Sequence, residues 1–237
     1  MSQNEVKALV FDVFGTVVDW RTSIIDECLI LGQQKHIDID WAKFVDDWRA
    51  GYRPALDTIR HDVGEWRVLD ELHMDILLGL LKSYSISLNA DEIIHLNKCW
   101  HRLHPWDDSV KGITRLNSKF ITASLSNGNV SLLTNMAKFA KLPWTCILSA
   151  EIFKHYKPDD EVYRGAANIL DLKPHQVMMV AAHKSDLLAA KSNGLVTAYI
   201  NRPYEFGKYY MEVEGVEKDI DIWASDLESL ADQLECN

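Results

Sequence analysis

The chain has 237 residues, of which 47% are hydrophobic and 25% charged, and its formal net charge at pH 7 is −10. This length suits one large domain, or a core domain with a smaller inserted one, and the apolar content is ordinary for a globular protein with a sizeable core. The negative charge argues against nucleic acid and anionic membranes as partners, because both attract basic surfaces. An anionic substrate would need a local cluster of positive groups.

The N-terminal sequence MSQNEVK lacks the basic start and long apolar stretch of a signal peptide, and no apolar run is long enough for a transmembrane helix. The four cysteines (Cys28, Cys99, Cys146 and Cys236) include no CxxC pair. We interpret them as reduced thiols rather than as disulfides or zinc ligands. Together these features predict a cytoplasmic protein.

Five short apolar runs predict strands at 7–12, 120–126, 145–150, 177–182 and 196–200. Each run is nearly continuous rather than alternating, which is typical of parallel strands covered on both faces. Helix-like stretches at 129–140, 159–170 and 184–192 alternate with the later strands. This alternation predicts an α/β fold with a doubly wound parallel sheet, a Rossmann-like core with right-handed crossovers.

The interval between the first two strands is far longer than one crossover helix requires, and it has helical periodicity. Two apolar stripes carry this signal: Trp41, Phe44, Val45 and Trp48, and then Leu69, Leu72, Ile76 and Leu77. No strand signal interrupts the interval. We therefore expect a catalytic core at 1–20 and 107–237, and an inserted all-helical cap domain at 21–106 over the carboxyl edge of the sheet.

Polar residues stand where several of the predicted strands end. Asp12 ends the first strand and Ser126 the second, whereas Lys157 follows the third and Asp186 the fourth. Each has an ordinary structural interpretation by itself, as a turn residue, a helix start or a solvated side chain. Because ligands bind outside the carboxyl ends of parallel strands, we expect these residues to converge at one edge of the sheet.

This ordered set resembles the haloacid dehalogenase superfamily, whose four motifs match DVFGT, SNG, the lysine of YKPD and the aspartate of AAHKSD. The long helical insertion matches the cap of that family, so the resemblance covers nearly the whole chain. More narrowly, FDVFGTVVD, the dipeptide Trp48-Arg49, LSNG and YKPDDEVY resemble the 2-haloacid dehalogenase branch. The resemblance implies a small anionic halogenated carboxylic acid as substrate, with neither a metal nor another cofactor.

Phe14 distinguishes two kinds of chemistry within this superfamily. The phosphatases have a second aspartate at this position, which protonates an alkoxide leaving group and later activates water. A halide leaves as a stable anion and needs no proton. Phe14 therefore favours carbon–halogen chemistry over phosphate-ester chemistry, although plain packing in an inactive relative is the alternative interpretation.

The resemblance implies a mechanism of two steps. Asp12 attacks the halogen-bearing carbon and forms an ester, which water then cleaves at its carbonyl. Lys157 keeps Asp12 ionised, Asp186 serves the lysine or the water, and Arg49 of the cap binds the halide or the substrate. The resemblance also implies that Thr16, Ser126 and Asn127 form hydrogen bonds around the nucleophile and the substrate carboxylate. Tyr163 would brace the lysine and the nucleophile.

The fourth motif departs from the family pattern. Ala181 and His183 stand where the well-studied dehalogenases have a serine and an asparagine. We expect a neutral His183 to take a proton from the ester-hydrolysing water, with Asp186 orienting the ring or stabilising the resulting cation. The imidazole is also larger than an asparagine side chain, which favours short acids such as haloacetates.

Other functions remain open at this level. One is a magnesium-dependent phosphohydrolase of the same superfamily, in which Asp12 and Asp186 would hold the metal. Others are a non-catalytic binding or scaffold protein, and a different hydrolysis through the same aspartyl ester. The sequence leaves undecided which halogen and chain length are preferred, and whether the chain forms a homodimer.

Overall fold

The computed structural model describes residues 5–61, 65–207 and 219–237. Its main feature is a sheet of six strands in the order β5-β4-β1-β6-β7-β8, and all neighbouring strands pair in parallel. The strands are β1 (Ala8–Phe11), β4 (Ile121–Ser126), β5 (Cys146–Ser149), β6 (Val177–Ala181), β7 (Val196–Ile200) and β8 (Ile222–Ala224). The chain winds away from β1 in both directions, so the α/β doubly wound fold is confirmed.

All five predicted strands are present, with ends within one residue of the expected ones. The sixth strand, β8, was not predicted. Its three residues, Ile222–Ala224, pair with β7 at the edge of the sheet. A strand this short contains no pattern that distinguishes it from a loop with a few apolar residues.

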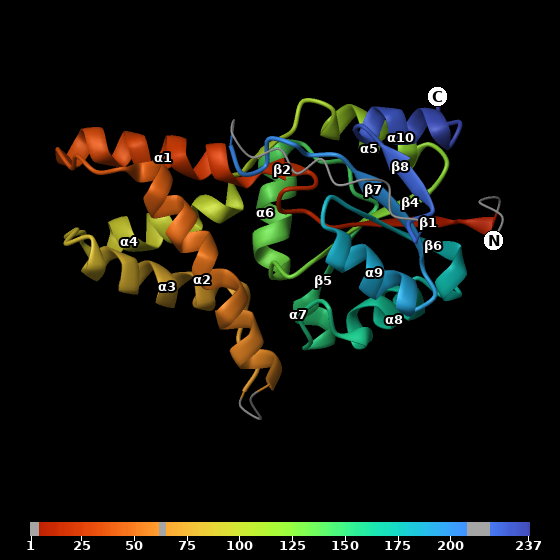
Figure 1. The fold of residues 1–237 in the computed structure, drawn as a ribbon, viewed down its shortest axis with the longest axis horizontal. Coiled ribbons are helices and arrows are strands. Elements are labelled where there is room, and N and C mark those ends of the chain that lie inside the picture. The colour runs from red at the N-terminus through yellow and green to blue at the C-terminus, as the bar shows by residue number, and fades with distance from the viewer. Residues whose placement is uncertain (1–4, 62–64, 208–218) are drawn as a thin grey trace.

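The side chains of the central strand β1 alternate between two apolar clusters, one on each face of the sheet. Leu9 and Phe11 join one cluster, whereas Val10 joins the other. The first face is covered by α5 (Ser109–Asn117), α6 (Val130–Ala140) and α10 (Leu227–Gln233). The second face is covered by α8 (Asp160–Ile169) and α9 (Lys184–Ser192). Figure 1 shows α5 and α10 above the sheet and α8 and α9 below it. Burial on both faces explains why the strand sequences are continuously apolar. The shorter helices α7 (Ala150–Phe153) and η3 (Pro174–Gln176) complete this half.

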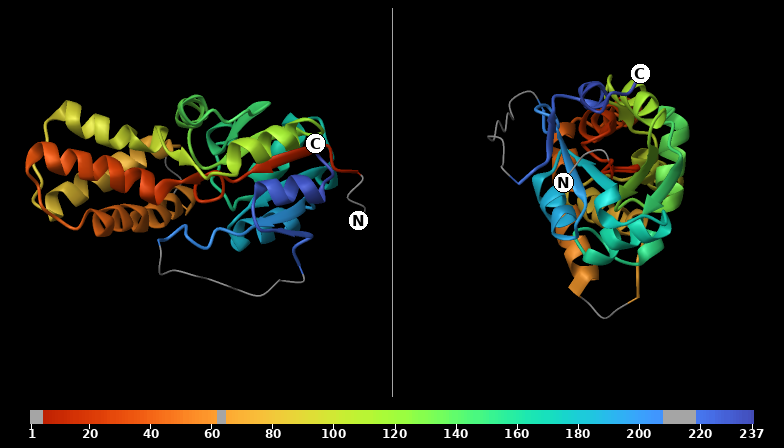
Figure 2. Two further views of the ribbon diagram at one scale, coloured as in Figure 1. Left: turned by 90° about the horizontal axis from the view of Figure 1, so that it is seen from above. Right: turned by 90° about the vertical axis from the view of Figure 1, so that its right-hand side faces the viewer.

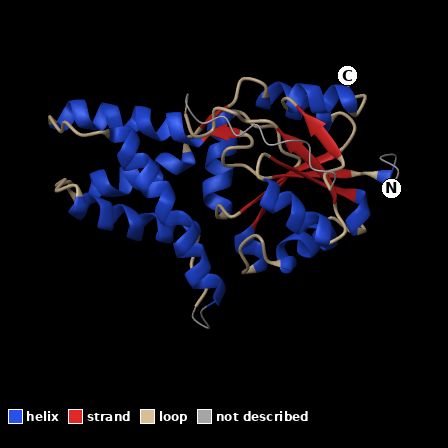
Figure 3. Cartoon of the chain, in the orientation of Figure 1, coloured by secondary structure: helices blue, strands red, loops and turns tan. Residues whose placement is uncertain are grey.

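Four helices form a separate layer at the carboxyl edge of the sheet (Figures 1 and 3). They are α1 (Trp20–Lys35), α2 (Trp41–His61), α3 (Leu69–Ser83) and α4 (Ala90–Asn97), and a 3-10 helix, η2 (Lys98–His101), follows them. The helix α2 packs against both α1 and α3 (Figure 2). The predicted apolar stripes face the interior, with Ile76 half-buried and the other seven members buried.

A short antiparallel pairing joins the two connections between this helical layer and the sheet. It consists of β2 (Val18–Asp19) and β3 (His104–Pro105). The prediction that no strand lies within 21–106 is therefore wrong at His104–Pro105. Two residues are too few to show a strand period. The boundaries of a core at 1–20 and 107–237 and a cap at 21–106 stay a prediction.

Aromatic packing holds the helical layer over the end of β1. The fully buried Trp100 ring lies 5.8 Å from the ring of Phe14 and 5.6 Å from that of Trp48, both in edge-to-face geometry. Trp106 donates a hydrogen bond from Nε1 to the carbonyl of Gly15 at 2.9 Å. These contacts fix α2 relative to the loop that follows β1.

Within the described residues, no helix combines the length and the apolar character needed to cross a bilayer.

Candidate active site

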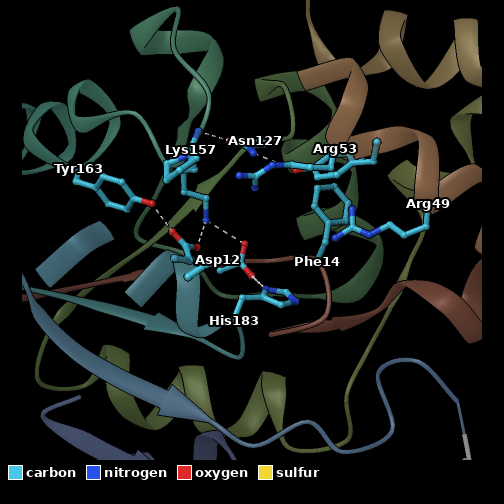
Figure 4. Close-up of a pocket in the computed structure, with 12 residues that line it drawn as sticks. Asp12, Phe14, Arg49, Arg53, Asn127, Lys157, Tyr163 and His183 are labelled. Carbon is cyan, nitrogen blue, oxygen red and sulfur yellow. Dashed lines mark hydrogen bonds and ion pairs between the residues drawn. The ribbon is translucent and has the colours of Figure 1, made fainter. Parts of the chain in front are cut away.

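A cavity of about 280 Å³ lies between α2 and the carboxyl ends of the strands (Figure 4). It is small for a ligand pocket and therefore suits a small molecule. Its walls come from five parts of the chain, as expected for a site at the edge of a parallel sheet. They comprise Asp12 and Phe14 after β1, Arg49, Tyr52 and Arg53 on α2, Asn127 after β4, Lys157, Pro158 and Tyr163 from the loop into α8, and His183, Ser185 and Asp186 at the start of α9.

Asp12 is buried at the centre of this site and accepts three hydrogen bonds. Lys157 Nζ lies 3.0 Å from Oδ1, Thr16 Oγ1 2.9 Å from Oδ2, and His183 Nδ1 2.8 Å from the same Oδ2. Burial raises the pKa of Asp12, but the charges of Lys157 and His183 outweigh it and hold the pKa well below the usual range. Asp12 is therefore an ionised carboxylate in a site shielded from water.

Lys157 connects the two carboxylates of the predicted set. Its Nζ donates to Asp12 and to Asp186 Oδ2, and its backbone N–H donates to Asn127 Oδ1 at 2.8 Å. Burial lowers the pKa of Lys157, but Asp12 and Asp186 outweigh it and raise the pKa above its ordinary value. The ammonium is thus fixed between its partners, and the expected pairing of Lys157 with Asp12 is present.

Tyr163 braces this network, but not by the expected contact. Its hydroxyl donates to Asp186 Oδ1 at 2.6 Å, so Tyr163 acts on Lys157 through Asp186 rather than on Asp12 directly. Burial, together with the adjacent Asp186 carboxylate, raises the pKa of Tyr163 and keeps the hydroxyl protonated. Burial is also the main reason why the pKa of Asp186 is raised.

Thr16 contacts the carboxylate as the sequence predicted. Its Oγ1 accepts a hydrogen bond from the backbone N–H of Ala182 at 2.8 Å, which leaves its own proton for Asp12 Oδ2. Asn127 lines the cavity and donates from Nδ2 to the Tyr52 hydroxyl at 3.0 Å. Ser126 differs from the prediction, because its hydroxyl accepts from the backbone of Gly128 at 3.2 Å and does not line the cavity.

Phe14 and Arg49 lie on the side of Asp12 opposite Tyr163 (Figure 4). Phe14 is only 3% exposed and contributes an apolar ring to the wall of the cavity. The Arg49 guanidinium lies 4.3 Å from the centre of the Tyr52 ring and 5.2 Å from that of Trp20. Its Nη1 is buried and has no hydrogen-bond partner among the described residues. A buried, unpaired guanidinium nitrogen beside a cavity is suited to an anion.

His183 has different partners from those predicted. Its Nδ1 faces Asp12, and its Nε2 lies 3.1 Å from each carboxylate oxygen of Glu205. Burial lowers the pKa of His183, but Glu205 and Asp12 outweigh it and raise the pKa to about 10. This environment favours the imidazolium over the neutral ring that the sequence led us to expect. Asp186 does not contact the ring as expected, because it pairs with Lys157 and Tyr163.

Several residues at the site were not in the predicted set, among them Pro158 and Ser185. Tyr52 and Arg53 follow Arg49 by three and four residues, so they share its face of α2. That spacing was a usable signal, whereas Glu205 lies on the loop after β7 and has no periodic relation to the other residues.

The donors do not fit a divalent metal. Lys157 Nζ donates to both Asp12 and Asp186, so the carboxylates that could ligate a metal are already paired with a cation. The described part of the chain also contains no group of three or more His, Cys, Asp or Glu side chains placed to hold a metal ion.

Comparisons with known proteins agree with the geometry. A model of the haloacid dehalogenase-like hydrolases matches residues 6–194. The crystal structure of an L-2-haloacid dehalogenase is 41% identical to this chain, covers 97% of it and 99% of its own chain, and has a TM-score of 0.91. A defluorinating L-2-haloacid dehalogenase is also 41% identical, with 98% of this chain and 96% of its own covered and a TM-score of 0.94. (S)-2-haloacid dehalogenase 4A of Burkholderia cepacia is 26% identical over 91% of this chain and 94% of its own length.

Proposed function

The chain belongs to the haloacid dehalogenase-like hydrolases, with 2-haloacid dehalogenases among its relatives, and on that premise we propose that it hydrolyses short 2-haloacids to 2-hydroxy acids. The reaction releases halide and proceeds through an ester on Asp12. One observation carries this proposal: Asp12 is a buried, ionised carboxylate paired with Lys157, and the apolar ring of Phe14 fills the wall beside it. This combination suits displacement of a leaving group that needs no proton.

In the first step, Asp12 Oδ1 attacks the halogen-bearing carbon. Oδ2 already accepts from Thr16 and His183, whereas Oδ1 accepts only from Lys157 among the described residues and keeps a lone pair for the carbon. The Oδ1–carbon bond forms as the carbon–halogen bond breaks, and the bonding electrons leave with the halide. Attack from the side opposite the halogen inverts the carbon.

Arg49 supplies the local positive charge for an anionic substrate in a chain with a net charge of −10. Its unpaired Nη1 receives the departing halide or the substrate carboxylate through a charge-assisted bond. Because Arg49 is on α2, the segment 21–106 acts in this proposal as a cap that completes the site. Phe14 keeps water away from the carboxylate until the ester has formed.

In the second step, water attacks the ester at Asp12 Cγ, and Asp186 accepts one of its protons. The Cγ–Oδ1 bond breaks, and the alkoxide takes a proton from Lys157, whose Nζ adjoins Oδ1. Asp186 returns its proton to Lys157 through their hydrogen bond. The new Asp12 carboxyl releases its remaining proton to solvent water, so the ionised carboxylate is restored for the next cycle.

The substrate hand and size follow from the relatives and from the site. The relatives carry names that specify the L or (S) hand, and we propose the same hand for this chain. The imidazole of His183 and the small cavity favour haloacetates and other short acids.

A homodimer, a cytoplasmic location and the absence of nucleic-acid binding stay predictions. Light scattering tests whether the chain forms a homodimer.

A halide-release assay tests this proposal directly. Chloroacetate and L-2-chloropropionate should release halide, D-2-chloropropionate should not, and EDTA should leave the rate unchanged. A parallel assay with p-nitrophenyl phosphate and magnesium should give no product. The proposal would be refuted if no halide were released and if p-nitrophenyl phosphate were cleaved only when magnesium is present. That result would support the phosphohydrolase alternative.

A further inference from the structure

Glu205 is a buried carboxylate in direct contact with the site but outside the reaction described above. It is 3% exposed, accepts a hydrogen bond from Trp20 Nε1 at 3.1 Å, and pairs with His183 Nε2. A carboxylate buried to this degree is costly unless a charge compensates it. His183 provides that charge at hydrogen-bond distance.

The first motif provides the space for this carboxylate. Gly15 has a φ of +83°, a conformation that residues with side chains rarely adopt, and a Cβ at this position would lie 2.1 Å from Glu205 Oε1. Because Gly15 has no Cβ, the Glu205 carboxylate can pack directly against the backbone of the turn after Asp12. Glu205, His183 and Asp12 form a continuous chain of contacts that ends at Oδ2.

The contacts of His183 determine what the ring can do. Both of its nitrogens face carboxylate oxygens, Nδ1 toward Asp12 and Nε2 toward Glu205, and this geometry favours a proton on each. A doubly protonated ring has no nitrogen left to accept a proton from water. The ring can instead donate to Asp12 Oδ2.

Formation of the ester changes the charges around this ring. Esterification at Oδ1 removes the negative charge of Asp12, so the imidazolium then has one carboxylate partner, Glu205. Oδ2 becomes the carbonyl oxygen of the ester, and attack by water places negative charge on it. A cationic donor at Oδ2 is most useful at this stage.

We propose that Glu205 is a positioning residue that keeps His183 protonated through the ester stage, so that Nδ1–H and the Thr16 hydroxyl form an oxyanion hole for ester hydrolysis at Oδ2. This inference rests on the proposed function and deepens it. It assigns His183 the role of an electrophilic donor in place of a general base.

The other charges near the ring belong to several elements. Those lining the two cavities that adjoin His183 are Arg49 and Arg53 on α2, Lys157 before α8, Lys184 and Asp186 on α9, and Arg202 after β7. Of the described ion pairs, those of His183 are with Asp12 and Glu205. Replacing Glu205 therefore removes the carboxylate that holds the imidazolium once the ester has formed.

Rapid-mixing experiments with Glu205→Gln and chloroacetate test the inference. We expect a halide burst of about one equivalent per site at a rate within threefold of wild type, followed by ester hydrolysis slowed about tenfold or more. The esterified peptide should accumulate and be visible by mass spectrometry. Glu27→Gln is the matched control, since Glu27 pairs with Arg102 and neither residue lines the cavity, and it should behave as wild type.

The pH profile of ester hydrolysis separates this role from that of a base. A required imidazolium supports hydrolysis at pH values below its pKa, and hydrolysis declines as the pH rises through that value. Glu205→Gln should move this decline to lower pH, because the neutral amide no longer favours the cation. A decline at acid pH is expected in any case, because Asp186 must be ionised to accept a proton. Hydrolysis that does not decline at high pH, with the same pH profile in Glu205→Gln as in wild type, would overturn the inference.

Nuclear magnetic resonance of ¹⁵N-labelled histidine provides a readout independent of turnover. The wild-type protein at pH 8 should show His183 with both nitrogens protonated, assigned by comparison with His183→Asn, and Glu205→Gln should shift the signal toward the neutral ring. A neutral His183 in the wild-type protein would overturn the inference even if the variant does not fold. If Glu205→Gln gave a normal halide burst and hydrolysed the ester at the wild-type rate, the inference about Glu205 would be overturned and the proposed function would stand. If the wild-type protein released no halide, the proposed function itself would be refuted.

Discussion

His183 Nδ1 lies 2.8 Å from Asp12 Oδ2, so the most distinctive residue of the fourth motif contacts the nucleophile of the first. An asparagine at this position, as in the family pattern that the sequence resembles, could donate a hydrogen bond but carry no charge. The imidazolium adds a positive charge to that of Lys157 on the same carboxylate. The two cations divide the oxygens of Asp12, with Lys157 at Oδ1 and His183 at Oδ2.

This division predicts the behaviour of His183→Ala. Lys157 remains to ionise Asp12, so the ester should still form and halide should appear in a burst of about one equivalent per site. Ester hydrolysis should slow about a hundredfold, the usual effect of losing one oxyanion donor. Stopped-flow halide detection, with mass spectrometry of the Asp12 peptide, measures both steps. Loss of the burst would assign His183 to substrate or halide binding, and wild-type kinetics would leave it no role in the reaction.

Arg49→Ala tests the anion site contributed by α2. Removing the unpaired guanidinium should lower kcat/KM for chloroacetate about a hundredfold, or roughly 3 kcal/mol of transition-state stabilisation. Arg53→Ala is the comparison on the same helix, because Arg53 is more exposed and already pairs with Asp57. It should lose less than about threefold. If the two effects were reversed, Arg53 would be the anion-binding residue.

Asp70 allows a test of stability away from the cavity. It pairs with His101 and Lys98 at the start of α3. Burial raises the pKa of Asp70, but these two partners outweigh it and lower the pKa from the ordinary 3.8 to about 2. Because the folded pKa is depressed, the contribution to stability is complete above pH 3.8 and is lost as the pH falls toward 2. It corresponds to about 2 kcal/mol.

Urea unfolding of Asp70→Asn measures this contribution. The variant should have a free energy of unfolding about 2 kcal/mol lower than wild type at pH 7, and the difference should shrink at pH 3. Asp75→Asn is the control, since Asp75 is 57% exposed and its pairing with Arg67 is expected to contribute little. An equal difference at pH 7 and pH 3 would show that the ionised carboxylate is not the source of the effect.

The sequence was informative where a residue type, a position at a strand end and a known motif coincided. Asp12, Lys157 and Asp186 follow β1, β5 and β6, and they meet because these parallel strands have their carboxyl ends at one edge of the sheet. The burial of Trp48 beside Arg49 followed from helical periodicity in the same way. Ser126 shows the limit of motif matching, because its hydroxyl serves the backbone of Gly128 instead of the cavity.

The partner of His183 could not be predicted from the sequence. Glu205 lies 22 residues later on an irregular loop, where no period indicates which way a side chain points. Its burial depends on the absence of a Cβ at Gly15 and on the indole of Trp20, both far from it in the chain. Long-range contacts of this kind require the tertiary structure, and here they favour the imidazolium over the expected neutral ring.

A single turnover in oxygen-18 water tests the covalent role of Asp12 most directly. With enzyme in excess over chloroacetate, the ester oxygen comes from Asp12 Oδ1, and the water oxygen enters Asp12 when Cγ is attacked. The hydroxy acid from this first turnover should therefore be unlabelled, and the Asp12 peptide should gain one oxygen-18 atom. Labelled hydroxy acid in the first turnover, with an unlabelled Asp12, would mean that water attacks the substrate directly and would contradict the ester mechanism.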